Sequence, residues 1–327
     1  MPRVSSRSRI PNLIAGTILA LTAAVLYTNF DPVPVGESPA HASAHEFSVV
    51  EEFKVPIPPE AAELPVVESN PDDTEANDTR GVTAPSTLSN HELIEYWMLL
   101  LKDGADYLKQ FETYTAVFHK QERLGGDLSK IQDIELKIRQ SPVFAVYMKW
   151  RNGDRGRQLL YSDDYKDGDM VVKLGGFKGR LLPGFRLNPM GSKARSEARH
   201  PVTDCGIMGM ADQMIARRRR DLAVGHGIRC TRLPNQEFDR RDCCCFLIEY
   251  DSPQISKEYR KSLTLLDAKY HFPVLARNYI WATEAHDLSE EDLDALTLVE
   301  NYSFTNIDFS KTLTTVDFSR ENPRYRM

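Results

Sequence analysis

The sequence predicts an α+β fold: a curled antiparallel sheet, an open half-barrel of about eleven strands, with helices packed in or over its concave face. Three observations predict this class. Short segments of alternating apolar and polar residues follow one another from residue 113 to 187 and again after residue 227, with turn residues between them. Two stretches with helical spacing interrupt the series. Strongly twisted sheets of this size tend to curl instead of staying open and flat.

Residues 1–30 have the order of an export signal. The basic stretch MPRVSSRSR precedes an apolar run from Leu13 to Leu26, and the chain then turns polar. A membrane span needs about 20 residues, so this run is short, and both a cleaved signal peptide and an uncleaved signal anchor stay open. Either one predicts an exported protein, and the anchor would also associate the N-terminus with a membrane.

Residues 31–88 are rich in proline and acidic residues and contain few aromatic ones, which predicts a disordered spacer without a core. Residues 1–88 hold 5 Lys+Arg against 12 Asp+Glu, a net charge of −7, which leaves +1 for residues 89–327. An electrically balanced domain is a poor candidate for nucleic-acid binding, which needs a large positive surface. Residues 89–327 contain no second linker and predict a single domain.

The domain opens with a helix. Ser89 and Glu92 fit a capping box, and the apolar residues of LIEYWMLLLKDGADYLKQF recur at helical spacing after it. Consecutive antiparallel strands follow at residues 113–123, 133–140, 142–150, 157–162, 169–175 and 179–187, separated by turns such as Asn152-Gly153. Phe144, Met148 and Trp150 share one strand face, where they line a hollow or form ordinary core.

A second helix is expected over residues 204–218. Ile207, Met210, Met214 and Ile215 form one continuous stripe on it. Methionine is flexible and polarisable, which suits a surface that meets ligands of variable shape. The stripe is therefore a candidate lid over a ligand, and a helix packed into the core is the simpler interpretation.

The last part of the chain predicts further strands in GIRCTRL, CCCFLIEY, EYRKSLTLLD, PVLARNYIW and TLVENYSF, with a short helix near SEEDLDAL. Period two places Cys243 and Cys245 on one face of their strand, and Cys244 with Phe246, Ile248 and Tyr250 on the other. The three cysteines therefore cannot converge on a metal ion. If LPNQEFDRRD closes a hairpin, Cys230 would lie opposite one of them, and a disulfide there is an open alternative to free thiols.

No catalytic motif is found. The sequence has no G-x-S-x-G, H-E-x-x-H or phosphate-binding G-x-x-x-x-G-K-[ST], and it indicates no cofactor. His119, Lys120 and Glu122 could serve acid or base roles. We expect Lys120 to point away from the other two, so a solvated polar strand end is the simpler interpretation. The basic run at residues 217–220 could contact anionic lipid headgroups.

A resemblance covers residues 89–327. FETYTAVFHKQERLGG, DIELKIRQSPVFAVYMKW and RQLLY, the later LNPMG and RHPVTDCGI, and the ending ENYSFTNIDFSKTLTTVDFSRENPRYRM resemble an uncharacterised family of exported bacterial proteins with one domain of unknown function. That family is distantly similar to the LolA-like periplasmic lipoprotein carriers. The resemblance implies a curled sheet with an apolar concave surface, helices as a lid, and a place in the periplasm or on the inner membrane facing it. It implies no reaction.

Two functions follow as hypotheses. The first is a non-catalytic cell-envelope protein that holds a lipid, an acyl chain or a lipoprotein segment in an apolar cavity. The residues named for such a site are Ile207, Met210, Met214, Ile215, Phe144, Met148, Trp150, Phe246, Ile248 and Tyr250. The second is a structural or protein-interaction domain without a small ligand, tethered outside the inner membrane. The sequence names no protein partner.

Overall fold

The computed structural model describes residues 88–283, 287–325 and 327, and all structural statements concern these residues. They fall within one compact unit. The predicted signal at residues 1–30 and the predicted spacer up to residue 87 lie outside the described residues. In the described part of the chain, no helix is both long enough and apolar enough to cross a membrane.

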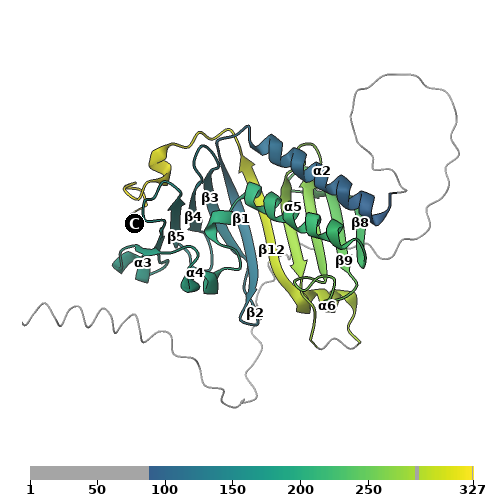
Figure 1. Ribbon diagram of the computed structural model, residues 1–327. Helices are drawn as coiled ribbons and strands as arrows, with labels where there is room; N and C mark the ends of the chain where they lie inside the picture. The colour runs from purple at the N-terminus through teal and green to yellow at the C-terminus, as the bar shows by residue number, and fades with distance from the viewer. Residues whose placement is uncertain (1–87, 284–286, 326) are drawn as a thin grey trace, which may run out of the picture. The chain divides into compact units, whose positions relative to one another are not determined.

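One antiparallel sheet of twelve strands forms the frame of this unit (Figure 1). Its order is β7-β6-β5-β4-β3-β1-β12-β11-β10-β9-β8, and β2 pairs with β1. The strands at the two edges, β7 and β8, are not paired with each other in the described structure, so the sheet is open. The predicted fold class is confirmed.

The sheet consists of β1 (Thr113–Leu124), β2 (Asp127–Leu128), β3 (Gln132–Arg139), β4 (Ala145–Trp150), β5 (Gln158–Ser162), β6 (Met170–Lys173), β7 (Phe185–Leu187), β8 (Ile228–Phe238), β9 (Arg241–Tyr250), β10 (Lys261–Asp267), β11 (Pro273–Tyr279) and β12 (Leu298–Asp308). The helices are α2 (Asn90–Leu108), α3 (Lys178–Leu181), α4 (Ser192–Glu197), α5 (Ile207–Val224) and α6 (Glu290–Thr297), with 3-10 turns η1 (Val202–Asp204) and η2 (Thr315–Phe318).

Helix α2 begins as the sequence predicts. The Ser89 hydroxyl accepts the Glu92 backbone N–H, and the Glu92 carboxylate accepts the Ser89 backbone N–H. Near its end, Gly104 touches the backbone of His271, where a Cβ on residue 104 would come within 2.4 Å of the His271 carbonyl. A glycine is therefore required for α2 to lie directly on the turn between β10 and β11.

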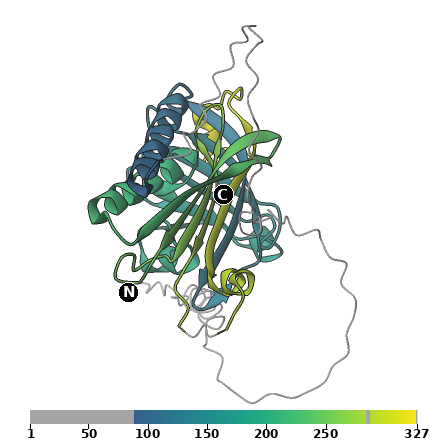
Figure 2. The ribbon, with the colours of Figure 1, turned by 90° about the vertical axis from the view of Figure 1, so that its right-hand side faces the viewer.

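Helix α5 runs beside α2, and both lie on the same side of the sheet, which we call the concave face (Figure 2). The sequence places this helix at residues 204–218, and in the structure it starts at Ile207 and continues to Val224. It continues because Arg218 and Asp221, two of the residues in its last turns, are buried and pair with each other at 2.7 Å. The spacing of apolar residues gives no sign of such a polar contact, so the sequence prediction ended the helix too early.

Two large apolar clusters fill the space between sheet and helices. One, which we call the second apolar cluster, lies between α2, α5 and strands β8–β12, where the Trp97 and Phe246 rings stack with centroids 5.0 Å apart. The other, which we call the first apolar cluster, runs along strands β1 and β3–β6 and also contains residues of β8–β12, among them Cys243 and Cys245. A third, smaller cluster lies on the opposite side of β4, where the Tyr147 and Tyr325 rings stack with centroids 3.8 Å apart.

The strand predicted at residues 179–187 is wrong over most of its length. Residues Lys178–Leu181 form a single helical turn, and only Phe185–Leu187 join the sheet, as its edge strand β7. Leu181 and Leu182, which lie within the predicted strand, are both exposed.

The expectation that Cys230 lies opposite one of the three cysteines is also wrong. The segment LPNQEF belongs to β8, so the hairpin turns at Asp239 and Arg240, and Cys230 pairs with Ile248. All five cysteines are free. The alternation of the three cysteines is as predicted: Cys243 and Cys245 belong to one apolar cluster, and Cys244 packs against the other.

Candidate functional site

A cavity of about 170 Å³ lies between the concave face and the segment from α4 to α5. We call residues 192–224 the cover segment. The floor comes from strands β1, β3–β7, β11 and β12, and the roof comes from α4, η1 and the part of α5 between Met210 and Arg217.

One part of the cavity wall is apolar. It consists of side chains that alternate along the strands with residues on the opposite face, together with methionines from α5. The apolar lining residues include Phe118, Ile134, Met148, Trp150, Leu159, Met170, Leu187, Met210, Met214 and Phe304. Such a wall offers contact to a hydrocarbon group without competing hydrogen bonds.

The other part of the wall contains two buried glutamates that face each other. Glu122 of β1 is directly opposite Glu300 of β12, and the two residues are 3 % and 1 % exposed. Like charges at directly opposite positions destabilise a sheet unless other groups compensate them. Lys120 supplies one such group, since its ammonium lies 3.0 Å from the Glu122 carboxylate.

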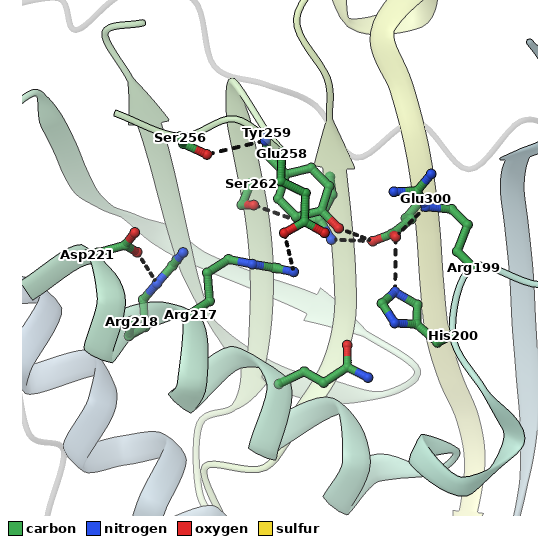
Figure 3. Close-up of polar contacts among 12 residues, drawn as sticks. Arg199, His200, Arg217, Arg218, Asp221, Ser256, Glu258, Tyr259, Ser262 and Glu300 are labelled. Atoms are coloured by element: carbon green, nitrogen blue, oxygen red, sulfur yellow. Dashed lines mark hydrogen bonds and ion pairs between the residues drawn. The ribbon is translucent and has the colours of Figure 1, made fainter. Parts of the chain in front are cut away.

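The cover segment supplies the other compensating groups (Figure 3). The Arg199 guanidinium and the His200 ring bind the same carboxylate oxygen of Glu300, at 2.6 and 3.0 Å. The Arg199 backbone N–H also donates to Glu122 at 3.3 Å, so this one residue bridges both glutamates. The loop between α4 and α5 is thereby held on the floor of the cavity.

The second oxygen of Glu300 accepts hydrogen bonds from the Tyr259 hydroxyl at 3.0 Å and the Asn278 amide at 2.8 Å. Burial raises the pKa of Glu300, but hydrogen bonds from His200, Arg199 and Asn278 and the nearby positive charge outweigh it and lower the pKa to about 2. Glu300 is therefore a fixed anion at neutral pH.

Glu122 is held in a similar way. The Tyr302 hydroxyl donates to it at 2.5 Å, and burial together with the charges of both glutamates raises the pKa of Tyr302. A carboxylate offers about four acceptor positions, and the four donors on Glu300 occupy them. This arrangement suits an anchor for the cover segment better than a general base, which must accept a proton from substrate.

Arg217 of α5 is the least satisfied cation at this end of the cavity (Figure 3). Its side chain is only 15 % exposed and lies over the Tyr259 ring, 4.4 Å from the centroid. Its one ion pair in the described structure is with Glu258, at 3.7 Å, and its Nε is buried without a hydrogen-bond partner. Burial of a charged donor without full hydrogen bonding costs free energy.

At the opposite end, the cover segment is held by other contacts. Arg157, beside the Trp150 ring, binds Glu197 of α4 at 2.5 Å. The Ile207 backbone N–H, at the start of α5, donates to the Tyr114 hydroxyl at 2.9 Å. The cover segment is thus fixed by a few polar contacts at its ends and in its central loop.

Four of the ten site residues named from the sequence line this cavity: Met148, Trp150, Met210 and Met214. Ile207 and Ile215 lie on the same helix but in the apolar clusters, and Phe144 packs against the first cluster. Phe246, Ile248 and Tyr250 lie under α2 in the second cluster, away from the cavity. Whether any of the ten binds a ligand stays a prediction.

The charged residues of the cavity are the part that sequence reasoning missed. Glu122 is buried, so the solvated polar strand end is a wrong interpretation, and Lys120 shares its face because the two are two residues apart. A signal was present in β12, where Glu300 alternates with the aromatic residues Tyr302 and Phe304. A charge at a position of that pattern indicates a buried, paired group.

Several solved structures are similar to this chain at low identity. A putative outer membrane lipoprotein-sorting protein domain from Vibrio parahaemolyticus is 13% identical, with 71% of this chain and 100% of that chain covered and a TM-score of 0.34. A LolA superfamily protein from Nitrosomonas europaea is 10% identical over 68% and 97%, with a TM-score of 0.29. The lipoprotein LppX from Mycobacterium tuberculosis is 8% identical over 67% and 99%, with a TM-score of 0.37.

No curated protein matches the chain. A family match covers residues 111–327, from the start of β1 to the last residue, and so includes every strand of the sheet and the whole cover segment. The chain belongs to the family described as protein of unknown function (DUF1571).

Proposed function

We propose that this domain is a non-catalytic, exported cell-envelope protein that binds a lipid or another amphiphile with an acyl chain in the cavity under the cover segment. The observation that carries the proposal is the two-part wall of the cavity, with apolar side chains of β3–β6 at one end and charged groups at the other. An amphiphile has the same division between chain and headgroup.

The polar end suggests how the ligand is oriented. The Arg217 guanidinium lines the cavity and has one long ion pair in the described structure, with Glu258 at 3.7 Å, so an acidic headgroup placed beside it gains a charge-assisted hydrogen bond. The acyl chain then extends along Met148 and Trp150. Glu300 keeps its own partners throughout, because Arg199 and His200 are already bound to it.

The size of the cavity sets a condition. A volume of about 170 Å³ is roughly six times the 30 Å³ that one water occupies in the liquid, so it admits a short hydrocarbon segment. A complete acyl chain requires the cover segment to move away from the sheet. The contacts of Arg199, His200 and Glu197 are the ones that would have to yield.

The proposal is tested by extracting the purified protein with organic solvent, identifying bound lipid by mass spectrometry, and measuring uptake of a fluorescent fatty acid. Met210→Trp fills the cavity from its roof and should lower the affinity for the fatty acid at least about tenfold, equivalent to roughly 1.4 kcal/mol.

The matched control is Met208→Trp on the same helix, because Met208 packs in the first apolar cluster and does not line the cavity. It should leave uptake unchanged. If the wild-type protein carries no lipid and takes up no fatty acid, the lipid-binding proposal fails and the structural or protein-interaction function is favoured.

A further inference from the structure

Residues 174–196 form an unusual surface at the β7 edge of the sheet. This edge segment contains α3, β7 and all of α4 except its last residue, Glu197, which is paired with Arg157. Five of the eleven large apolar side chains that are exposed in the described structure lie within residues 177–190: Phe177, Leu181, Leu182, Phe185 and Met190. Phe177, Leu181 and Met190 are 72%, 66% and 62% exposed. Isolated exposed apolar residues are ordinary, whereas such a concentration in one segment marks an interaction surface.

The charge of the same segment has only one sign. It contains five Lys and Arg residues and no Asp or Glu, although residues 89–327 as a whole are almost neutral. Arg186 is paired with Asp167 at 2.9 Å. Within the described residues, Lys178, Arg180 and Arg195 form no ion pair. The edge segment therefore presents net positive charge among exposed apolar side chains.

The local backbone keeps these side chains outside. Gly179 is buried in the turn of α3, where a Cβ would come within 1.8 Å of the Leu174 carbonyl oxygen. The turn therefore packs on the domain through Gly179, and its neighbours Phe177, Lys178 and Arg180 are exposed. Lys193 of α4 lies over the Phe185 ring, 5.8 Å from the centroid, which joins α4 to the same surface.

The edge segment is continuous with the apolar part of the cavity. Leu187, Pro189 and Ala194 belong to the segment and also line the cavity. An acyl chain at this surface could therefore pass along apolar side chains into the space beneath the cover segment.

We propose that residues 174–196 are a docking face for a bilayer that contains anionic lipids. Phenylalanine and leucine side chains partition into the boundary between headgroups and acyl chains, while lysine and arginine pair with lipid phosphates. The edge segment combines only positive charge with exposed apolar side chains, and these two features are complementary to the anionic headgroups and the acyl chains at that boundary. The inference goes beyond the proposed function, since the face can hold a membrane whether or not the cavity takes up lipid.

The test uses the full chain, in which the apolar stretch at residues 13–26 offers a second means of binding vesicles. The measurement must therefore report on the edge segment itself. Hydrogen exchange of residues 174–196 is followed by mass spectrometry with phosphatidylglycerol vesicles, with phosphatidylcholine vesicles and without lipid. Exchange in this segment should slow at least about fivefold with the anionic vesicles and less with the neutral ones, since an anionic surface attracts lysine and arginine side chains.

Two variants should abolish this protection, one with Lys178→Glu and Arg180→Glu and one with Phe177→Ser and Leu181→Ser. The matched controls should keep it. Arg219→Glu with Arg220→Glu removes an exposed basic pair on α5, and Leu99→Ser with Leu296→Ser removes apolar side chains that are exposed elsewhere.

Equal exchange with and without anionic vesicles would overturn the proposal, as would protection that survives in both edge-segment variants or is lost in the Arg219 and Arg220 control. Fatty-acid uptake in solution without vesicles distinguishes this failure from failure of the proposed function. The edge-segment variants should take up fatty acid normally, and Met210→Trp should still dock.

Discussion

At the scale of single residues, Glu300 joins the floor of the cavity to the cover segment. Glu300→Gln removes the charge on which Arg199 and His200 depend and leaves them facing a neutral amide. Loss of one partner from a buried ion pair costs about 3–5 kcal/mol, and we expect a loss of this size in the free energy of unfolding. Urea unfolding at pH 7 measures this loss. The control is Glu95→Gln, which removes one partner of the exposed pair between Glu95 and His91 and should change the free energy of unfolding little.

The same residue gives a dependence on pH. Its pKa in the folded protein is about 2, below its ordinary value of 4.5, so folding favours the ionised form. The stability it contributes is fully present above about pH 4.5 and is lost as the pH falls toward 2. Glu300→Gln should unfold with a flatter pH dependence over this interval, and an unchanged profile would show that other groups dominate.

Two neighbouring residues of α5 allow a position that lines the cavity to be compared with one that does not. Met214 and Ile215 are equally buried and both belong to the second apolar cluster, but only Met214 also lines the cavity. Met214→Ala should cost less than the roughly 2–5 kcal/mol of a packed core position, and Ile215→Ala should fall within that range. Chemical denaturation compares them, and Met214→Ala should also weaken fatty-acid uptake. A large loss of stability for Met214→Ala without lipid uptake in the wild type would make the helix ordinary core.

At the scale of elements, the start of α5 depends on one glycine. Gly206 has φ +101°, and a Cβ there would lie 2.7 Å from the Tyr114 hydroxyl that binds the Ile207 N–H. Gly206→Ala should lose about 1–3 kcal/mol of stability and speed hydrogen exchange at the start of α5.

The control for this prediction is Gly126→Ala. Gly126 has a similar φ of +107° but no neighbouring atom within 4 Å of a Cβ. Gly126→Ala therefore measures only the backbone cost of placing alanine at a positive φ. Its loss of stability should be smaller than that of Gly206→Ala, and hydrogen exchange in α5 should not change. Equal effects in the two variants would mean that the contact with Tyr114 contributes nothing.

Local patterns predicted most elements but not the site. The capping box placed the start of α2, and alternation placed the strands, because both signals lie within a few residues of sequence. The pairing of Glu122 with Glu300 depends on β1 lying beside β12, which no local pattern encodes. The strand predicted at residues 179–187 is mostly wrong because the sequence pattern does not distinguish leucines exposed at a sheet edge, such as Leu181 and Leu182, from leucines in a strand.

At the scale of the molecule, we expect the segment before Ser89 to be dispensable for folding. Its proline-rich, acidic composition offers no core, and α2 and the sheet supply the apolar clusters of the described residues. A chain that begins near residue 86 should melt cooperatively at the same temperature as one that begins near residue 45. A melting temperature many degrees lower for the shorter chain would contradict this boundary.

The position of β12 has a consequence for the order of events during folding. The first strand pairs with the last, and the Tyr302–Glu122 hydrogen bond joins residues 180 positions apart. Pairings between such distant residues form late, because the intervening chain must be brought together first. Until the final strand is in place, Glu122 has neither Tyr302 nor the bridge to Glu300. A nascent or prematurely ended chain therefore lacks both the centre of its sheet and the polar end of the cavity.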